Sequence, residues 1–211
     1  AGFGPPAGRP YNPGMGTGLA SALSNHFLIA MPGMADSNFD GTVVFIAEHD
    51  ERGALGIVVN RPLELDLGEL FERIDVPLRP RELASRPVYF GGPVQTDRGF
   101  VLHQPRGDWT STVPVGDDIS LTSSKDILEA VGAGNGPSRL LVSLGYAGWG
   151  PGQLEDEIGR NAWLTVPAQA DLIFDVPAEQ RFPAAFALLG IDPSRLSGAA
   201  GQKAAVWDID V

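Results

Sequence analysis

The order of the apolar segments along the chain restricts its fold more than any other feature. Short continuous apolar runs, which suit buried strands, are interrupted by segments with helical spacing of apolar residues. From the amino terminus the order is strands, helix, strands, helix, strand, helix, strands, helix. A doubly wound parallel sheet needs strands and helices in strict alternation. The sequence therefore predicts an α+β fold built on a mixed sheet.

Three apolar runs, 27–31, 43–47 and 55–59, give the clearest strand signals. The loop between the second and the third, 49–53, is polar and ends in glycine, which predicts an antiparallel hairpin. The same reasoning predicts further strands at 88–90, 100–102, 140–144, 163–166 and 172–174.

The first two predicted helices carry recognisable end signals. Asp66 opens the first helix, because Glu69 stands three residues further on as its capping partner. Ser123 and Ser124 can cap the second helix, which ends in the glycine cluster 132–136. That cluster follows a helix instead of joining a strand to a helix, so we interpret it as a helix terminator and not as a phosphate loop.

Prolines set the starts of the last two predicted helices. Pro151 suits the first position of the third helix. Pro183 is tolerated only in the first turn of a helix, so the fourth helix is predicted to start near Phe182.

The predicted organisation is one α+β domain, residues 25–197, between two small-residue-rich ends. Residues 1–24 are rich in Gly, Pro and Ala without sustained periodicity, which predicts a flexible segment. Residues 198–211 form a tail that either docks on the domain or extends from it.

Charge and composition exclude several function classes. The formal net charge is −11, with 26 acidic and 15 basic residues, so the chain repels phosphate backbones and direct nucleic-acid binding is disfavoured. The chain has no cysteine, which excludes disulfides, thiolate catalysis and cysteine-ligated metals. No apolar run approaches the roughly 20 residues that span a bilayer, so we expect a cytoplasmic protein with no membrane association.

Two hydroxyl motifs have plain structural interpretations. Ser143 and Gly145 follow a strand as in a nucleophile elbow, but Leu141 stands where the first glycine of that motif belongs. We therefore predict that Ser143 is a buried strand serine bonded to backbone. The run 122–125 resembles a serine–lysine catalytic motif only if threonine replaces serine, and helix capping already explains its hydroxyls.

The three histidines, His26, His49 and His103, each flank a predicted strand. A fold that brought them together could hold a metal or supply a general base, although none shows the i, i+4 spacing of metal ligands. Structural roles are favoured, and no metal or cofactor is expected. The acidic run 155–157 is explained by the dipole of a helix start and by solvent.

Three glycine-rich segments at predicted strand exits are the candidate ligand site. If one sheet edge brings them together, they form a polar pocket floored by Tyr146 and Trp149, in which Arg61 offers a forked cation. Ordinary turn chemistry explains the same residues. The candidates are Asn60, Arg61, Gly91, Gly92, Gln95, Tyr146, Gly148 and Trp149.

The chain resembles the AlgH/YqgE family of bacterial proteins over roughly 24–198. The resemblance runs through the ordered motifs 26–32, 48–49, 53–56 with 60–62, 91–95 with 97–103, 144–149 with 152–155, and 161–164. It implies an α+β fold with a mixed, largely antiparallel and partly barrel-like sheet surrounded by helices. Family members are sometimes labelled transcriptional regulators, but the resemblance carries over no catalytic residues. Where family members have a reactive cysteine, this chain has none.

Two functions stay open at this point. The leading hypothesis is a non-enzymatic regulatory or binding module that acts through protein partners or a small polar ligand. The alternative is a small-molecule enzyme, hydrolase-like, in which one of the three histidines acts as a base beside Arg61. The oligomeric state is not predicted, and self-association through a sheet edge or through Trp149 and Trp163 is a third possibility.

Overall fold

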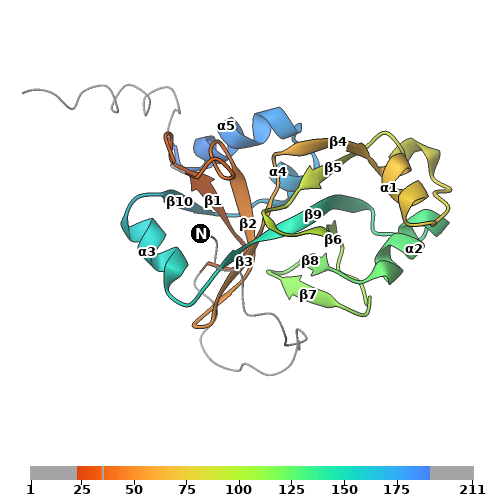
Figure 1. Ribbon diagram of the computed structural model, residues 1–211, viewed down its shortest axis with the longest axis horizontal. Coiled ribbons are helices and arrows are strands. Elements are labelled where there is room, and N and C mark those ends of the chain that lie inside the picture. The colour runs from red at the N-terminus through yellow and green to blue at the C-terminus, as the bar shows by residue number, and fades with distance from the viewer. Residues whose placement is uncertain (1–22, 35, 191–211) are drawn as a thin grey trace, which may run out of the picture.

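The computed structural model describes residues 23–34 and 36–190 (Figure 1). Almost all of the predicted amino-terminal segment, 1–24, and the whole predicted tail, 198–211, lie outside the described residues. Both predictions therefore stay predictions.

Ten strands and five α-helices make up the described part of the chain. The strands are β1 (His26–Ala30), β2 (Val43–Asp50), β3 (Gly53–Val58), β4 (Pro62–Asp66), β5 (Pro87–Phe90), β6 (Val94–Gln104), β7 (Thr112–Val115), β8 (Ile119–Thr122), β9 (Arg139–Trp149) and β10 (Trp163–Pro167). The helices are α1 (Leu67–Arg73), α2 (Lys125–Ala133), α3 (Gln153–Gly159), α4 (Ala170–Phe174) and α5 (Ala178–Leu188), and a short 3₁₀ helix spans Arg81–Leu83.

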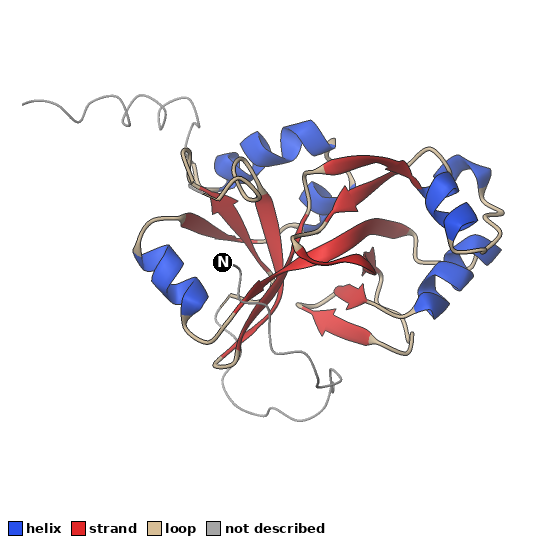
Figure 2. Ribbon diagram, viewed as in Figure 1, coloured by secondary structure: helices blue, strands red, loops and turns tan. Residues whose placement is uncertain are grey.

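All ten strands join one curled sheet that forms a half-barrel, as the red strands of Figure 2 show. Its main order is β10-β1-β2-β3-β9-β6-β8-β7, and β4 and β5 branch from β9. The ladder between β5 and β9 is parallel, whereas the other ladders are antiparallel. The predicted mixed, largely antiparallel sheet is confirmed.

Strand β9 joins the two halves of the sheet. One edge pairs with β6 along most of its length. The other edge pairs first with β5, at Ser143 and Leu144, and then with β3, from Ala147 to Trp149. Where β9 changes neighbours, Gly145 has a φ of +74°, a conformation that suits glycine.

Helices cover both faces of the sheet (Figure 1). On the inner face, α4 and α5 cover a core that includes Phe27, Phe45 and Phe186. On the outer face, α3 covers one half of the sheet over Leu154 and Trp163. In the other half of the outer face, α1 and α2 pack against a cluster formed with β5, β6 and β9. No helix in the described ranges is long and apolar enough to cross a membrane.

Local sequence signals positioned several elements correctly. The predicted hairpin is formed by β2 and β3. Asp66 and Glu69 form the predicted capping box at the start of α1, since each side chain accepts a hydrogen bond from the other residue's backbone N–H. Helix α2 ends at Gly134, whose φ of +84° is the left-handed cap that the glycine cluster predicted.

Two predictions around the last helices were wrong. The run 172–174 belongs to helix α4 and not to a strand, because so short an apolar run has no period that separates the two structures. Helix α5 begins at Ala178, so Pro183 lies inside it. Pro183 and Glu179, whose carbonyl loses its helical partner, are both exposed, so water can hydrogen-bond to that carbonyl.

Three strands and parts of two others, β6 before Phe100 and β9 after Leu144, were not predicted. Strands β4, β7 and β8 lie in segments without a continuous apolar run. Residues 145–149 were interpreted as a loop after a strand, but β9 continues through them to Trp149. Helix α3 begins at Gln153, two residues after Pro151.

Candidate functional site

Asn60 and Arg61 hold the loop between β1 and β2. The Asn60 side-chain oxygen accepts a hydrogen bond from the Val43 backbone N–H at 2.8 Å, and its amide donates to the Gly41 carbonyl at 2.9 Å. The Arg61 guanidinium donates to the carbonyls of Asn38 and Asp40, each at 2.6 Å. Both side chains therefore have structural partners within their own half of the sheet.

The backbone segments of the three candidate exits do meet. The Phe90 N–H donates to the Arg61 carbonyl, and the Gly91 N–H donates to the Leu144 carbonyl, both at 2.8 Å. Gly92 has a φ of +152°, and a Cβ placed there would lie 2.1 Å from the Tyr146 carbonyl carbon. The glycines therefore serve close packing of one backbone segment against another.

The prediction that Tyr146 and Trp149 floor one pocket was wrong. Tyr146 belongs to the inner core and contacts Phe100 edge to face, whereas Trp149 belongs to the outer cluster under α3. Residues three apart on a strand face opposite sides of a sheet. Gly148 lies between them within β9 and has the Tyr146 ring beside it, and Gln95 lies on β6, exposed.

The carboxylate of Glu157 fixes α3 to the sheet. One oxygen accepts hydrogen bonds from the indole N–H groups of Trp149 and Trp163, at 2.9 and 2.8 Å. The other oxygen accepts from the Gln153 amide at 2.9 Å. These contacts give Trp149 a structural partner.

The three histidines do not converge on one site. His26 Nδ1 lies 3.1 Å from the Ser24 carbonyl, and His49 Nε2 lies 2.8 Å from a Glu155 carboxylate oxygen. His103 lies on β6, four positions from β1 in the strand order. No group of three potential metal ligands occurs among residues 23–34 and 36–190. The predicted base that combines a histidine with Arg61 is not formed.

A polar cavity of about 500 Å³ lies at the end of β7 and β8, away from the predicted exits. Small-molecule sites in proteins commonly have volumes in this range. The loop after β6, the strands β7 and β8, and the first turn of α2 supply its walls. The lining residues are Arg106, Gly107, Asp108, Trp109, Thr110, Thr112, Pro114, Ser120 and Asp126.

The cross-strand register explains why polar side chains gather at this cavity. Ser120 on β8 lies opposite His103 on β6 and opposite Pro114 on β7. Thr122, two residues further along β8, lies opposite Thr112. Directly opposite residues of antiparallel strands share a face. The alternation of β8 therefore places both hydroxyls on the cavity face and Ile119 and Leu121 in the inner core.

His103 is fully buried and hydrogen-bonds through both ring nitrogens. Its Nδ1 lies 3.0 Å from the Pro105 carbonyl oxygen, and its Nε2 lies 2.9 Å from Thr122 Oγ1. Desolvation by burial lowers the pKa of His103, so the ring is neutral near pH 7. Because a carbonyl can only accept, Nδ1 carries the proton and Nε2 accepts from Thr122.

Ser120 Oγ is fully buried and has no hydrogen-bond partner among the described residues. Ser143 provides a contrast on the neighbouring strand, because its equally buried hydroxyl donates to the Phe100 carbonyl at 3.4 Å. The predicted structural role of Ser143 is therefore confirmed. Ser120 lines the cavity with an unused donor and unused acceptors.

Asp126 is a fixed part of the cavity wall. Its carboxylate accepts hydrogen bonds from the backbone and hydroxyl of Thr110, each at 2.8 Å, and from Ser124 Oγ and the Ile127 N–H. Desolvation acts to raise the pKa of Asp126, but the hydrogen bonds from Ser124 and Thr110 outweigh it, so the pKa is lowered. Asp126 is ionised and its charge is already compensated by donors.

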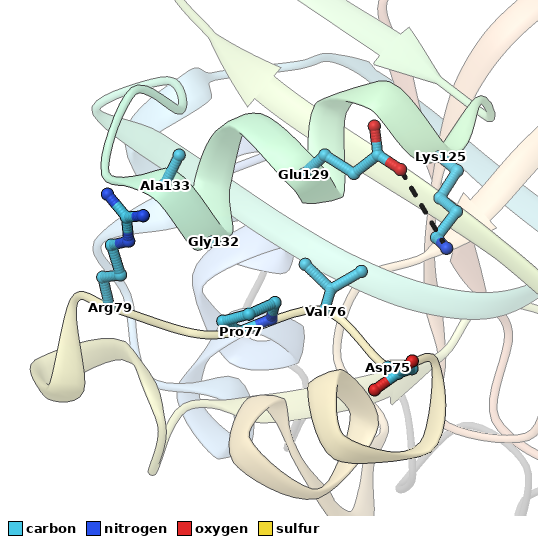
Figure 3. Close-up of a pocket in the computed structure, with 8 residues that line it drawn as sticks. All are labelled: Asp75, Val76, Pro77, Arg79, Lys125, Glu129, Gly132 and Ala133. Carbon is cyan, nitrogen blue, oxygen red and sulfur yellow. Dashed lines mark ion pairs between the residues drawn. The ribbon is translucent and has the colours of Figure 1, made fainter.

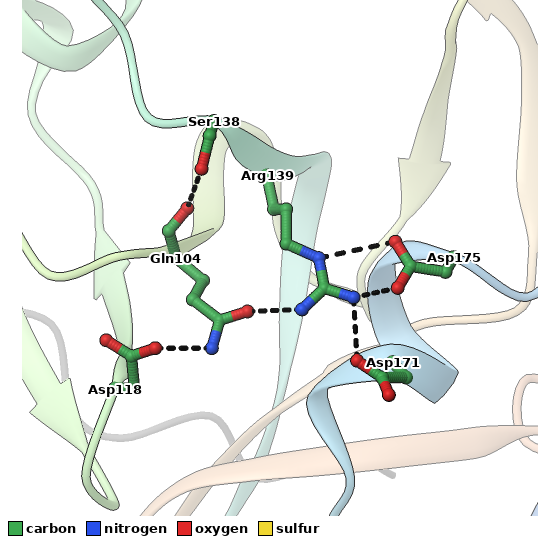
Figure 4. A network of polar contacts seen from close by, with 6 residues as sticks. All are labelled: Gln104, Asp118, Ser138, Arg139, Asp171 and Asp175. Carbon is green, nitrogen blue, oxygen red and sulfur yellow. Dashed lines mark hydrogen bonds and ion pairs between the residues drawn. The ribbon is translucent and has the colours of Figure 1, made fainter.

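A network around Arg139 holds the strand end from which the cavity loop departs (Figure 4). The guanidinium donates to the Gln104 side-chain oxygen at 2.5 Å and to Asp171 at 2.7 Å, and it also pairs with Asp175. Gln104 in turn donates to Asp118, in the turn between β7 and β8, at 2.5 Å. The ends of β6, β8 and α4 are therefore tied together beside the cavity.

A smaller cavity of about 260 Å³ lies between α2 and the segment that follows α1 (Figure 3). Its charged side chains include Lys125 and Glu129, which form an i, i+4 ion pair at 4.0 Å on α2. No buried polar atom without a partner lines it among the described residues. Its lining residues therefore give no indication of a ligand.

Comparison with known proteins identifies the family. A family model described as AlgH-like (DUF179) matches residues 27–194. The chain belongs to this family.

AlgH-like relatives cover almost the whole chain. A UPF0301 protein of Ralstonia nicotianae is 60% identical over 180 residues, which cover 85% of this chain and 95% of that protein. A UPF0301 protein of an Azoarcus species is 59% identical over 188 residues, which cover 89% of this chain and 100% of that protein.

Two solved structures share the fold. The solution structure of AlgH from Pseudomonas aeruginosa matches with a TM-score of 0.72 and 46% identity, and the match covers 90% of this chain and 100% of that chain. A crystal structure of a Corynebacterium diphtheriae protein matches with a TM-score of 0.61 at 19% identity, over 82% of this chain and 88% of that chain. The second likeness concerns the AlgH-like fold alone.

The cavity of this AlgH-like domain was missed because its wall comes from strands that the sequence did not predict. The alternation of Ser120 and Thr122 with Ile119 and Leu121 was the available signal, since polar residues at every second position indicate one polar strand face. His103 was recognised as a candidate, but only in combination with the other histidines.

Proposed function

We propose that this AlgH-like protein is a non-enzymatic binding module that holds a small polar ligand in the 500 Å³ cavity. The observation that carries the proposal is the buried, unpartnered hydroxyl of Ser120 in the cavity wall. A buried polar group without a partner costs about 1–3 kcal/mol. A ligand that hydrogen-bonds to Ser120 offsets this cost, so binding is favoured at this point.

The fixed hydrogen bonds around the cavity favour binding over catalysis. His103 is neutral, but its Nε2 already accepts from Thr122 and does not face a free nucleophile. Arg61, the cation of the hydrolase-like alternative, is occupied by loop carbonyls in the other half of the sheet. In this proposal, the regulatory role arises because a bound ligand alters the conformation of the exposed loop 105–110. A protein partner can contact this loop.

The ligand role predicted for the exit segments stays a separate prediction. The side chains of Asn60 and Arg61 have structural partners, so a ligand there has to bind to their remaining hydrogen-bonding groups. The Ser120 hydroxyl, in contrast, has no partner among the described residues.

Protein-observed NMR tests the proposed function. The backbone amides of the full chain are followed while polyols, amino acids, dicarboxylates and nucleosides are added separately at millimolar concentration. At least one class is expected to shift the signals of residues 106–126, and Ser120→Ala is expected to reduce its affinity while Ser143→Ala does not. The proposal fails if no class shifts these signals, or if both variants behave alike.

A further inference from the structure

The hydrogen-bond chain behind the cavity sets which atoms face a ligand. Because His103 Nε2 is an acceptor, the Thr122 hydroxyl donates to it. Thr112 Oγ1 lies 2.8 Å from Thr122 Oγ1, whose proton is already used, so Thr112 must donate to Thr122. A hydroxyl has one proton and two lone pairs. Thr112 therefore presents only acceptors to the cavity.

Ser120 complements this arrangement. Its hydroxyl is free both to donate and to accept, since it has no partner in the described chain. A ligand group that satisfies Thr112 has to donate, and a group that satisfies Ser120 fully has to do both. Hydroxyl groups meet both requirements, whereas a carboxylate or phosphate oxygen offers only acceptors.

The charges on the cavity wall disfavour anions. Arg106 donates to the Gly116 carbonyl and supplies the one cation among the lining residues. Asp108 is exposed at the rim, and Asp126 is ionised and saturated by donors. The lining therefore carries two carboxylates and one cation, so an anionic ligand is repelled more than it is attracted. A ligand without a negative charge avoids this penalty.

Trp109 supplies an apolar surface beside these polar groups. Its ring contacts His103 edge to face, with ring centroids 4.9 Å apart, and Gly107 packs against it. The residue is half-buried and lines the cavity. An aromatic ring held in this way suits the apolar C–H face of a cyclic ligand.

We infer that the cavity accepts a polyhydroxylated molecule without a negative charge, a sugar or a cyclic polyol. The inference rests on the proposed function and specifies its ligand class. Hydroxyls donate to Thr112 and Asp108 and pair with Ser120, while the C–H face lies against Trp109.

Three probes that share one ring distinguish the ligand classes. D-glucose is uncharged, D-glucosamine adds an ammonium group, and D-glucuronate adds a carboxylate. Each is titrated into the full chain while the Trp109 indole N–H and the amides of residues 106–122 are followed by NMR. Glucose and glucosamine are each expected to bind at least about tenfold more tightly than glucuronate.

Variants test the hydrogen-bond polarity. Thr112→Val keeps the shape of the side chain but removes the acceptors, and it is expected to weaken glucose binding by about fivefold to tenfold. Ser120→Ala is expected to weaken it similarly. Ser143→Ala, a buried serine outside the cavity, is the matched control and is expected to leave the affinity unchanged.

The outcomes separate this inference from the proposed function. Glucuronate binding at the cavity that is as tight as glucose binding, or tighter, overturns the inference but retains the binding module. An unchanged affinity in Thr112→Val also overturns it. If none of the three probes shifts the cavity signals, the inference is wrong, and the binding module is abandoned only when the wider panel of polar compounds fails as well.

Discussion

Ser120 and His103 lie directly opposite each other in the β6–β8 ladder, yet their hydrogen bonding differs completely. His103 uses both ring nitrogens, whereas Ser120 Oγ has no partner in the part of the chain that the structure describes. Two buried polar side chains on one face therefore have different energetic roles. His103 stabilises the fold, whereas we propose that Ser120 hydrogen-bonds to a ligand.

Ser120→Ala is expected to stabilise the ligand-free protein by up to about 1 kcal/mol, because it removes a buried polar atom without a partner. Ser143→Ala is expected to destabilise it by about 1 kcal/mol, because the Phe100 carbonyl loses a donor. Urea unfolding of both variants beside the parent measures the difference. Equal destabilisation by the two substitutions contradicts the assignment of Ser120.

The lowered pKa of His103 gives the fold a defined pH dependence. The unfolded chain binds a proton near the usual histidine value of about 6.5, and the folded chain does so only at lower pH. Stability is therefore full above this value and falls as the pH decreases from about 6.5 towards the folded pKa. The measurement is the free energy of unfolding at several pH values from about 7.5 to about 5, a range that includes the usual histidine pKa.

His103→Gln is expected to flatten this slope, although it lowers stability at every pH. Ser143→Ala, which removes no titratable group, is the control that is expected to keep the slope of the parent. An identical slope in the parent and in His103→Gln rules out His103 as its source.

Gly92→Ala is expected to destabilise the fold by roughly 4 kcal/mol or more. Its Cβ would lie within 2.1–2.3 Å of the backbone of Tyr146 and Ala147, and its φ is +152°. Gly99→Ala is the matched strand glycine, with nothing within 4 Å of a Cβ, and is expected to change stability by no more than about 0.5 kcal/mol. Thermal unfolding compares them, and comparable melting temperatures contradict the close approach.

Glu157→Ala is expected to release α3 and to cost about 2 kcal/mol, because two indole N–H groups lose a charged acceptor. Tryptophan fluorescence is expected to shift to longer wavelength, and the amides of α3 are expected to exchange faster. Asp156→Ala, at the exposed neighbouring position, controls for the loss of one helical carboxylate. A spectrum that stays at the parent wavelength argues against this anchor.

Local signals predicted those elements whose residues determine their own structure. The apolar run of β2 and the capping box of Asp66 and Glu69 act through neighbours in sequence, so they could be recognised without the fold. The run 172–174 could not be classified, because its burial against the inner core depends on α5 and the sheet. Tertiary contacts decided that segment.

In the candidate site, too, some features could be predicted from local sequence signals and others depended on tertiary structure. The approach of the exit segments was anticipated at the level of the backbone, but the direction of the side chains was not. Gly145 interrupts the alternation of β9, so that Leu144 faces the outer cluster while Tyr146 faces the inner core. Beyond such an irregularity, the face on which a side chain lies can no longer be found by counting every second residue from the start of the strand.

The position of β9 has a consequence for how the molecule comes apart. Because β9 pairs with β3 towards its end and with β6 along its length, both halves of the half-barrel lose a ladder if this strand detaches. We expect the amides of β9 to exchange with solvent only through global opening, and the two halves to melt in one transition. The domain is therefore expected to unfold as one cooperative unit. The cavity and the contacts beneath α3 are lost in the same transition.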